Sequence, residues 1–251
     1  MDVDGCALRL HTLAPAGRLR DVLAPTVVLV HGIGMSHRSF HRTQRALAVA
    51  GHRTVSVDLP GFGGVPGPGR RQDVEELGDM VVRAVAAHGA GELVLVGQSM
   101  GTQVVAEAAR LHPDAVSSVV LIGPVVAAGR RSAVLQGIDL ARDCVREGVR
   151  MNGVVGTDYL RSMPQYLREL RPMLRHRLED TLPRLGQPVL VVRGSEDPIA
   201  RRDWAQRLAA VAGQGAFVEL PGPHHVQEHQ PVAFAGLVDE FRRVQTLGAR
   251  G

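Results

Sequence analysis

A serine between two glycines is the residue of this sequence with the clearest chemical potential. Gly97-Gln98-Ser99-Met100-Gly101 follows directly on the apolar run 93–96. A nucleophilic serine must be lifted out of the backbone on a sharp turn between a strand and a helix, and small neighbours let those two elements approach each other. The spacing and its position therefore predict that Ser99 is the nucleophile of an acyl-transfer reaction.

A second motif has the composition of a loop that binds negative charge. His31-Gly32-Ile33-Gly34 follows the apolar run 27–30, so it is expected beside Ser99 at one edge of a sheet. Acyl transfer places negative charge on the carbonyl oxygen, and fixed backbone N–H donors stabilise that charge. We expect the N–H groups of Ile33 and Met100 to be these donors. The side chain of His31 is expected to be a buried hydrogen-bonding group.

Two further loops offer an acid and a base. Gly194-Ser195-Glu196-Asp197-Pro198 follows the apolar run 189–192, and Gly222-Pro223-His224-His225 follows the run 217–220. A serine hydroxyl attacks well when a neutral imidazole takes its proton, and a carboxylate fixes the tautomer of that imidazole. The order nucleophile, acid, base predicts Asp197 as the acid and His224 as the base. Neighbouring residues remain alternatives, namely Glu196 for the acid and His225 for the base.

The elements that must position these residues alternate along the chain. Short apolar runs that end in turns are typical of buried parallel strands, and they fall at 27–30, 93–96, 119–122 and 189–192. Stretches with apolar residues three or four apart predict helices at about 37–50, 73–88, 100–111 and 201–211. This alternation predicts an α/β fold. Residues 2–13 have the pattern of a hairpin that turns at Asp4-Gly5 and forms an antiparallel edge.

The segment 125–185 interrupts the alternation. It has no strand pattern and contains eleven arginines against seven acidic residues, with Pro164, Pro172 and Pro183 as expected helix boundaries. So long a loop without structure is rare, which predicts a helical cap inserted into one domain spanning 1–251. Its positive excess would favour anionic substrates, unless the arginines pair with the acidic residues of the same segment.

Composition excludes several other classes of protein. No apolar run reaches the ~20 residues of a membrane span, and no basic region leads into an apolar run at the start, so a cytoplasmic location is expected. All 29 basic residues are arginines, scattered and with few aromatic residues, which argues against nucleic-acid binding. Cys6 and Cys144 are expected to be free thiols. No metal or dinucleotide motif is present, so we expect no cofactor, no metal and a small-molecule substrate.

Taken together, these motifs resemble the α/β-hydrolase superfamily over nearly the whole chain. The stretch Asp58-Leu59-Pro60-Gly61-Phe62-Gly63 is similar to the one that follows the family's next strand. Pro231, seven residues after His224, favours His224 over His225 by the same resemblance. The chain departs from the family at Gly64, where the family often has Ser, and at Pro223, where it often has Gly.

The resemblance implies a mostly parallel central sheet flanked by helices, an inserted helical cap and a triad of Ser99, Asp197 and His224. Serine rather than aspartate at position 99 argues against the dehalogenase and epoxide hydrolase branches and implies an acyl-enzyme. A carboxylic ester hydrolase acting on a small molecule is the leading hypothesis. A carbon–carbon bond hydrolase of ring-cleavage products is the alternative, against which Arg193 stands where that branch usually has Trp. A non-catalytic ligand-binding protein of this fold is a third reading.

Overall fold

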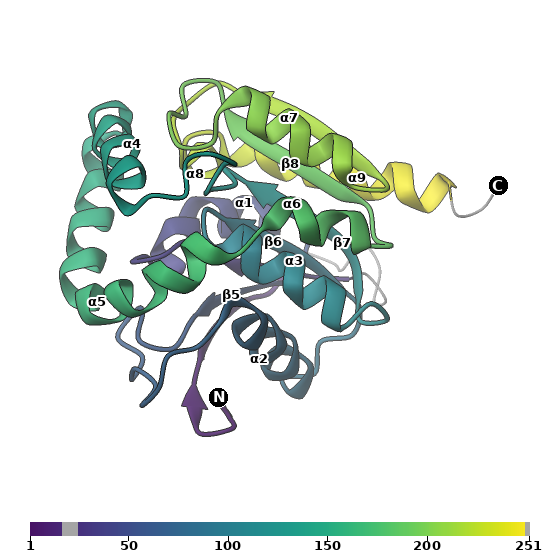
Figure 1. Ribbon diagram of the computed structural model, residues 1–251. Helices are drawn as coiled ribbons and strands as arrows, with labels where there is room; N and C mark the ends of the chain where they lie inside the picture. Colours follow the sequence, from purple (N-terminus) through teal and green to yellow (C-terminus); the bar gives the residue numbers. More distant parts are fainter. Residues whose placement is uncertain (17–24, 249–251) are drawn as a thin grey trace.

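The computed structural model describes residues 1–16 and 25–248, and these form a twisted sheet covered by helices on both faces (Figure 1). In the described residues the large sheet has seven strands in the order β3-β5-β4-β6-β7-β8-β9. All neighbours are parallel except β3, which runs antiparallel to β5. The strands are β3 (Arg9–Leu13), β4 (Thr26–Val30), β5 (Thr54–Asp58), β6 (Leu93–Gln98), β7 (Val116–Ile122), β8 (Val189–Gly194) and β9 (Gly215–Leu220). The four apolar runs identified in the sequence lie in β4, β6, β7 and β8, which confirms the predicted α/β fold.

The amino-terminal hairpin is shorter than expected. β1 (Asp2–Val3) and β2 (Cys6–Ala7) form a separate antiparallel pair around a turn in which Asp4 and Gly5 both have positive φ. Only β3 joins the large sheet, as its antiparallel edge. The expectation of an antiparallel edge is therefore right, but the hairpin that precedes it is a ribbon of its own.

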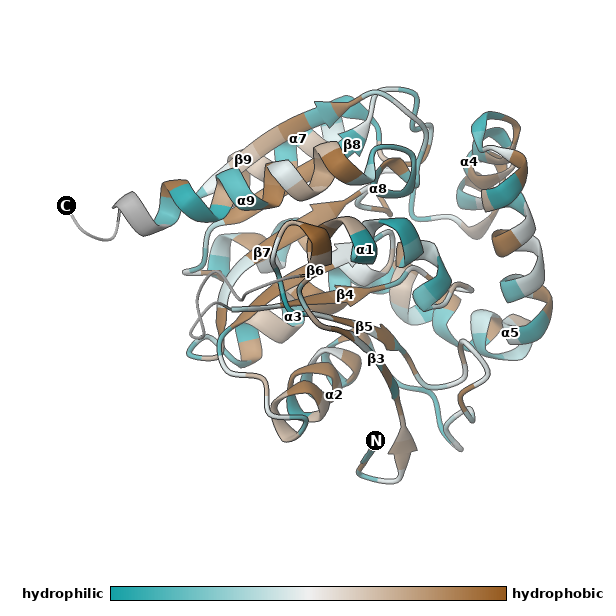
Figure 2. Ribbon diagram, turned by 180° about the vertical axis from the view of Figure 1, so that it is seen from behind, coloured by the Kyte–Doolittle hydropathy of each residue, from teal (hydrophilic) through white to brown (hydrophobic). Residues whose placement is uncertain are grey.

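Two helical layers bury the two faces of the sheet. Along β4, Val28 and Val30 pack into one apolar cluster, while Val27 and Leu29 pack into the other. The first face is covered by α2 (Val74–Ala87), α3 (Gly101–Leu111) and α7 (Arg202–Val211). The second face packs against η1 (His37–Phe40), α1 (His41–Val49), α8 (Val226–His229) and α9 (Pro231–Gly248). Figure 2 shows the apolar strands between these helices. Burial on both faces explains why the strands are continuous apolar runs rather than alternating ones.

The segment 125–185 connects β7 to β8 and is helical, with α4 (Ala133–Arg146), α5 (Val149–Arg175), α6 (Leu178–Thr181) and η2 (Leu182–Arg184). α4 and α5 stand to one side of the sheet (Figure 1). The expectation that Pro164 and Pro172 end helices is wrong, because α5 continues through both as one helix of 27 residues. A proline removes one backbone donor and bends a helix without necessarily ending it. Figure 1 shows α5 curving along its length.

None of the helices in the described part of the chain combines the length and the apolar character that a membrane span requires.

Candidate active site

Ser99 lies on a strained turn between β6 and α3. Its φ is 57°, in the left-handed region that a residue other than glycine rarely adopts. The two flanking glycines are required by close backbone approach: a Cβ on Gly97 would lie 2.2 Å from the carbonyl oxygen of Gly101, and one on Gly101 would lie 2.2 Å from that of Val30. The backbone N–H of Ser99 donates to the carbonyl of Ile122 over 2.9 Å. The turn is thus held against the ends of β4 and β7.

The loop after β4 packs directly on this turn. A Cβ on Gly32 would lie 2.8 Å from Ser99 Cβ and 3.3 Å from Ser99 Oγ, so only glycine fits there without displacement of the serine. Within the described residues, the backbone N–H groups of Ile33 and Met100 have no hydrogen-bond acceptor. Met100 follows Ser99 in the chain, and Ile33 follows Gly32, which packs on Ser99, so both unpaired donors belong to segments next to the candidate nucleophile. Unpaired donors near the nucleophile are what stabilisation of an oxyanion requires.

His31 fixes the start of that loop. Its Nδ1 donates to the carbonyl of Gly32 over 2.8 Å, and its Nε2 accepts a hydrogen bond from the backbone N–H of Leu59 over 3.1 Å. Burial lowers the pKa of His31, so the ring is neutral with its proton on Nδ1. This is the buried hydrogen-bonding role expected from the sequence.

His224 and Asp197 form a buried pair at the ends of β9 and β8. The Nδ1 of His224 donates to Asp197 Oδ2 over 2.8 Å. The other oxygen of Asp197, Oδ1, accepts hydrogen bonds from the backbone N–H groups of Ile199 and Ala200 over 2.7 and 2.9 Å. Both side chains are almost completely buried. The carboxylate therefore fixes the imidazole with its Nε2 unprotonated when the ring is neutral.

The end of β7 brings this pair close to Ser99. Ile122 accepts the hydrogen bond from Ser99, and a Cβ on the next residue, Gly123, would lie 2.8 Å from the ring of His224 and 3.2 Å from Asp197 Oδ2. The Nε2 of His224 is buried and has no hydrogen-bond partner in the described residues, so it is not hydrogen-bonded to Ser99 Oγ. In enzymes without substrate such a contact is often long.

The charge around His224 is negative. Burial alone would lower the pKa of His224, but the charge and hydrogen bond of Asp197, with the charges of Asp143 and Glu147, raise it to about 9. An imidazole in this setting holds a proton strongly once it has taken one.

The comparisons with known proteins agree with this fold. Residues 25–143 match the family model for the α/β-hydrolase fold. The solved structure of an enol-lactonase from Burkholderia xenovorans LB400 is similar with a TM-score of 0.80 and 21% identity, covering 96% of this chain and 98% of that one. The chain has the α/β-hydrolase fold.

Curated relatives match part or most of the chain. A probable esterase from rice (Oryza sativa subsp. indica) is 37% identical over 112 residues, 43% of this chain, and the match spans only 42% of the length of the rice protein. The dihydrolipoyllysine-residue acetyltransferase component of an acetoin cleaving system from Pseudomonas putida is 28% identical over 261 aligned positions, 93% of this chain and 68% of that protein.

The two alternative residues, Glu196 and His225, are not part of the Asp197–His224 pair. Glu196 is exposed, whereas Asp197 faces His224. His225 donates to Glu147 from Nδ1 over 2.9 Å and so points away from the pair. The assignment of Ser99, Asp197 and His224 as catalytic, with Ile33 and Met100 as oxyanion donors, stays a prediction that this arrangement makes geometrically consistent.

Arg193 is a residue of the site that the sequence did not identify as such. Its guanidinium donates to the backbone carbonyls of Asp197 and Ala200 over 3.0 and 2.8 Å, and it forms an ion pair with Glu219. It therefore holds the loop that carries the candidate acid. The sequence gives no local signal for this role, since an arginine after a strand is usually a solvated charge.

Asp143 on α4 and Glu147, the residue directly after that helix, also reach the site. Asp143 Oδ1 accepts the backbone N–H of His224 over 3.0 Å, and Glu147 Oε1 accepts that of His225 over 2.9 Å. Glu147 Oε2 also accepts from His229 Nε2 over 2.7 Å. Burial alone would raise the pKa of Glu147, but these histidine contacts lower it to about 2. The sequence places both acids among possible arginine partners, and the structure instead pairs them with the histidine loop.

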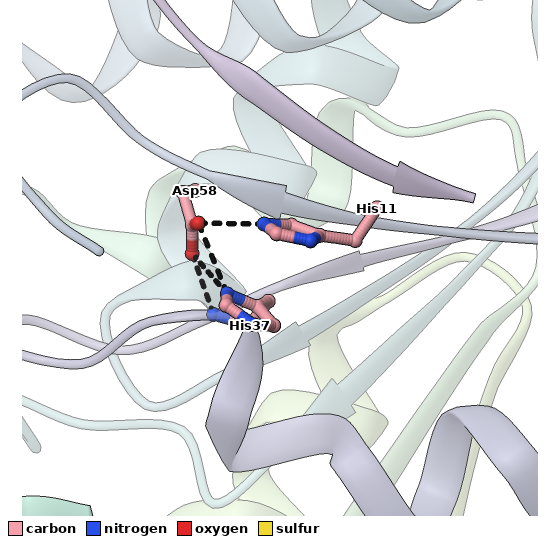
Figure 3. Close-up of side chains that lie close together, drawn as sticks. All are labelled: His11, His37 and Asp58. Carbon is pink, nitrogen blue, oxygen red and sulfur yellow. Dashed lines mark hydrogen bonds and ion pairs between the residues drawn. The ribbon is translucent and has the colours of Figure 1, made fainter. Parts of the chain in front are cut away.

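A third group of titratable residues lies at the end of β5, where Figure 3 shows His11 and His37 facing Asp58. Asp58 Oδ2 accepts from His11 Nε2 over 2.8 Å, and both its oxygens lie 3.0 Å from His37 Nδ1. The rings are stacked, with centroids 3.6 Å apart and planes 18° apart. Nearly parallel rings cannot direct their nitrogen lone pairs at one point, as a metal ion requires. The cluster suits a shared carboxylate instead, in keeping with a structural Asp58.

Proposed function

We propose that this chain is a serine hydrolase that cleaves a carboxylic ester, or a related acyl bond, of a small molecule through an acyl-enzyme. The observation that carries the proposal is the buried hydrogen bond of 2.8 Å between His224 and Asp197, next to a serine held at a φ of 57°. An isolated strained serine or an isolated histidine–carboxylate pair has many structural explanations. Their meeting at one sheet edge, beside two unpaired N–H groups, favours acyl transfer.

In the proposed reaction, His224 Nε2 takes the proton of Ser99 Oγ as that oxygen attacks the carbonyl carbon of the substrate. The carbonyl oxygen becomes negatively charged and accepts hydrogen bonds from the N–H groups of Ile33 and Met100. The tetrahedral intermediate then breaks its bond to the leaving alcohol, which receives the proton from His224. A water molecule repeats the sequence on the acyl-enzyme, releasing the carboxylic acid and restoring Ser99.

Asp197 remains ionised throughout this cycle. It holds the imidazole in the tautomer that leaves Nε2 free and stabilises the imidazolium that forms during each proton transfer. We propose that the 125–185 segment acts as a cap whose residues select the substrate, and that the enzyme is cytoplasmic and needs no cofactor. The names of the rice and Burkholderia proteins, an esterase and a lactonase, support acyl chemistry in this superfamily.

A fluorophosphonate probe tests the mechanism without knowledge of the substrate, because it reacts with an activated serine and mimics the tetrahedral intermediate. We expect labelling of the purified chain at Ser99, identified by peptide mass spectrometry, and no labelling of Ser99→Ala. An unlabelled but folded protein contradicts the proposal and favours the non-catalytic ligand-binding alternative.

A panel of p-nitrophenyl esters and coenzyme A thioesters of increasing acyl length then identifies the bond and the chain length. A vinylogous ring-cleavage diketone belongs in the same panel. Cleavage of that compound alone, with every ester untouched, points to the carbon–carbon bond hydrolase alternative.

A further inference from the structure

We propose that Asp143, on the first helix of the 125–185 segment, is a positioning residue for the base His224, so that this segment orients the catalytic histidine as well as covering the site. The inference rests on the proposed function, because it assigns a role to a residue that acts through His224. Nothing in the sequence pattern suggests it, since 81 residues separate the two.

The end of α4 matches the spacing of the segment 222–225, which is called the histidine loop here. Asp143 is in the last turn of α4, and Glu147 ends the helix with its N–H bonded to the carbonyl of Asp143 over 2.9 Å. Their carboxylates accept the backbone N–H groups of two consecutive residues, His224 at 3.0 Å and His225 at 2.9 Å. Two acceptors at this spacing fix both the position and the direction of the loop that carries the base.

A second observation is the burial of Asp143. Its side chain is 1% exposed, and no arginine pairs with it within the described residues. This burial raises the pKa of the Asp143 carboxyl. Burying a carboxyl without a cation is costly, and within the described residues the one hydrogen-bond donor to this carboxylate is the backbone N–H of His224. Asp139, one turn earlier and equally buried, is paired with Arg130 and Arg142, and none of its hydrogen bonds or ion pairs among the described residues is with the histidine loop.

A third observation is electrostatic. The groups that face His224 within the described residues are Asp197 after β8, Asp143 on α4, Glu147 directly after α4, the neighbouring His225 ring in a T-shaped contact, and Gly123 after β7. Each of the three carboxylates favours the imidazolium that His224 becomes when it takes the serine proton. Asp143 therefore has two separable effects on the base: its oxygen places the backbone of His224, and its charge stabilises the protonated ring.

Two substitutions separate these effects. Asp143→Asn keeps an oxygen acceptor for the His224 N–H but removes the charge, whereas Asp143→Ala removes both. Asp139→Asn is the matched control, because it neutralises an equally buried carboxylate of the same helix that does not touch the loop. For each protein we would measure the second-order rate constant of labelling by a fluorophosphonate between pH 5 and 10, with thermal unfolding to verify folding.

The expected results differ between the variants. In Asp143→Asn the upper plateau of the labelling rate is kept and the acid limb moves to lower pH, because loss of a nearby negative charge lowers the pKa of His224. In Asp143→Ala the limb moves in the same direction and the plateau falls by about tenfold to a hundredfold, the effect of a misplaced catalytic group. Asp139→Asn keeps the profile of the unmodified chain even where its stability drops.

The inference is overturned if Asp143→Asn leaves the acid limb in place, or if Asp139→Asn moves it equally. If Asp143→Ala does not fold, the limb of the folded Asp143→Asn protein decides alone. An unmodified chain that is not labelled at any pH contradicts the proposed function instead, so the two failures are distinguishable.

Discussion

The carboxylate of Asp158, on α5, accepts a hydrogen bond from the hydroxyl of Ser36 over 2.6 Å, although 122 residues separate them. Arg38 donates to the other oxygen of Asp158 over 2.7 Å, and Ser162 on the same helix donates to the carbonyl of Gly34 over 3.1 Å. The loop that carries the candidate oxyanion donor Ile33 is thus tied to α5. The 125–185 segment therefore holds the candidate oxyanion loop through α5 and the histidine loop through α4.

Asp158→Ala tests the first of these ties. Removing the carboxylate leaves the buried hydroxyl of Ser36 without its acceptor, which we expect to lower the free energy of unfolding by about 1–3 kcal/mol. In ester hydrolysis, kcat should fall by a larger factor than KM rises, because the oxyanion loop loses its support. Urea denaturation and steady-state kinetics measure the two effects. Asp180→Ala is the control, since its exposed ion pair with Arg177 spans 3.7 Å and should be worth little.

Substitution of the two adjacent histidines decides which is the base. His224→Ala should lower kcat/KM by several orders of magnitude, as Ser99→Ala should, because the serine then has no proton acceptor. His225→Ala should lower thermal stability, through loss of the hydrogen bond to Glu147, and leave most of the activity. Esterase assays and melting curves on both variants check this. Loss of activity in His225→Ala alone would assign the base to His225.

Asp197→Asn should be milder than removal of the histidine but still severe. The asparagine amide carries no charge and can also present its NH₂ group to Nδ1, so the imidazole loses its fixed tautomer. Its protonated form also loses the stabilisation by the carboxylate. The corresponding substitution lowers kcat by about 10⁴ in a well-studied triad. Full activity in this variant would transfer the role of the acid to another carboxylate, with Glu196→Gln as the comparison to make.

The pH dependence of hydrolysis follows from the charges around His224. The base must be neutral to accept a proton, and the neighbouring carboxylates raise its pKa to about 9. We therefore expect kcat/KM to be low at neutral pH and to rise through the alkaline range as the ring loses its proton. A profile measured with an uncharged ester tests this. An acid limb below the ordinary histidine value of 6.5 would contradict the electrostatic reading.

A matched pair of esters, one neutral and one carrying a carboxylate, tests whether the arginine-rich 125–185 segment steers anions. Several of its arginines are already paired, among them Arg130 with Asp139, Arg131 with Glu179 and Arg150 with Glu228. We expect kcat/KM for the two esters to depend on salt in parallel. A selective decline for the anionic ester as salt rises would show that the unpaired arginines act as a steering field.

Local patterns predict the sheet and the candidate triad because their signals are contained in short stretches. The apolar runs mark strands buried on both faces, and each candidate catalytic residue directly follows one of them. The alternation of strands with helices then places their loops at one edge, so Ser99, Asp197 and His224 could be grouped before any contact was known.

The supporting residues could not be found in this way. Asp143, Glu147 and Asp158 are acids in an arginine-rich amphipathic segment, where local spacing favours ion pairs with nearby arginines. Their partners instead lie about 80 to 120 residues away in the chain, and only folding brings them within reach. They are backbone amides and histidine rings for Asp143 and Glu147, and the Ser36 hydroxyl and the distant Arg38 for Asp158. The continuation of α5 through Pro164 and Pro172 has a similar cause, because tertiary packing outweighs a local helix-breaking preference.

The left-handed backbone of Ser99 has a consequence for the history of the chain. A non-glycine residue at this φ costs on the order of 1–3 kcal/mol, and glycine would adopt the same conformation freely. If stability alone were selected, glycine would be favoured at position 99, because it adopts this φ without steric cost. Serine at position 99 therefore costs the fold stability, as expected of a residue that is selected for the reactivity of its hydroxyl.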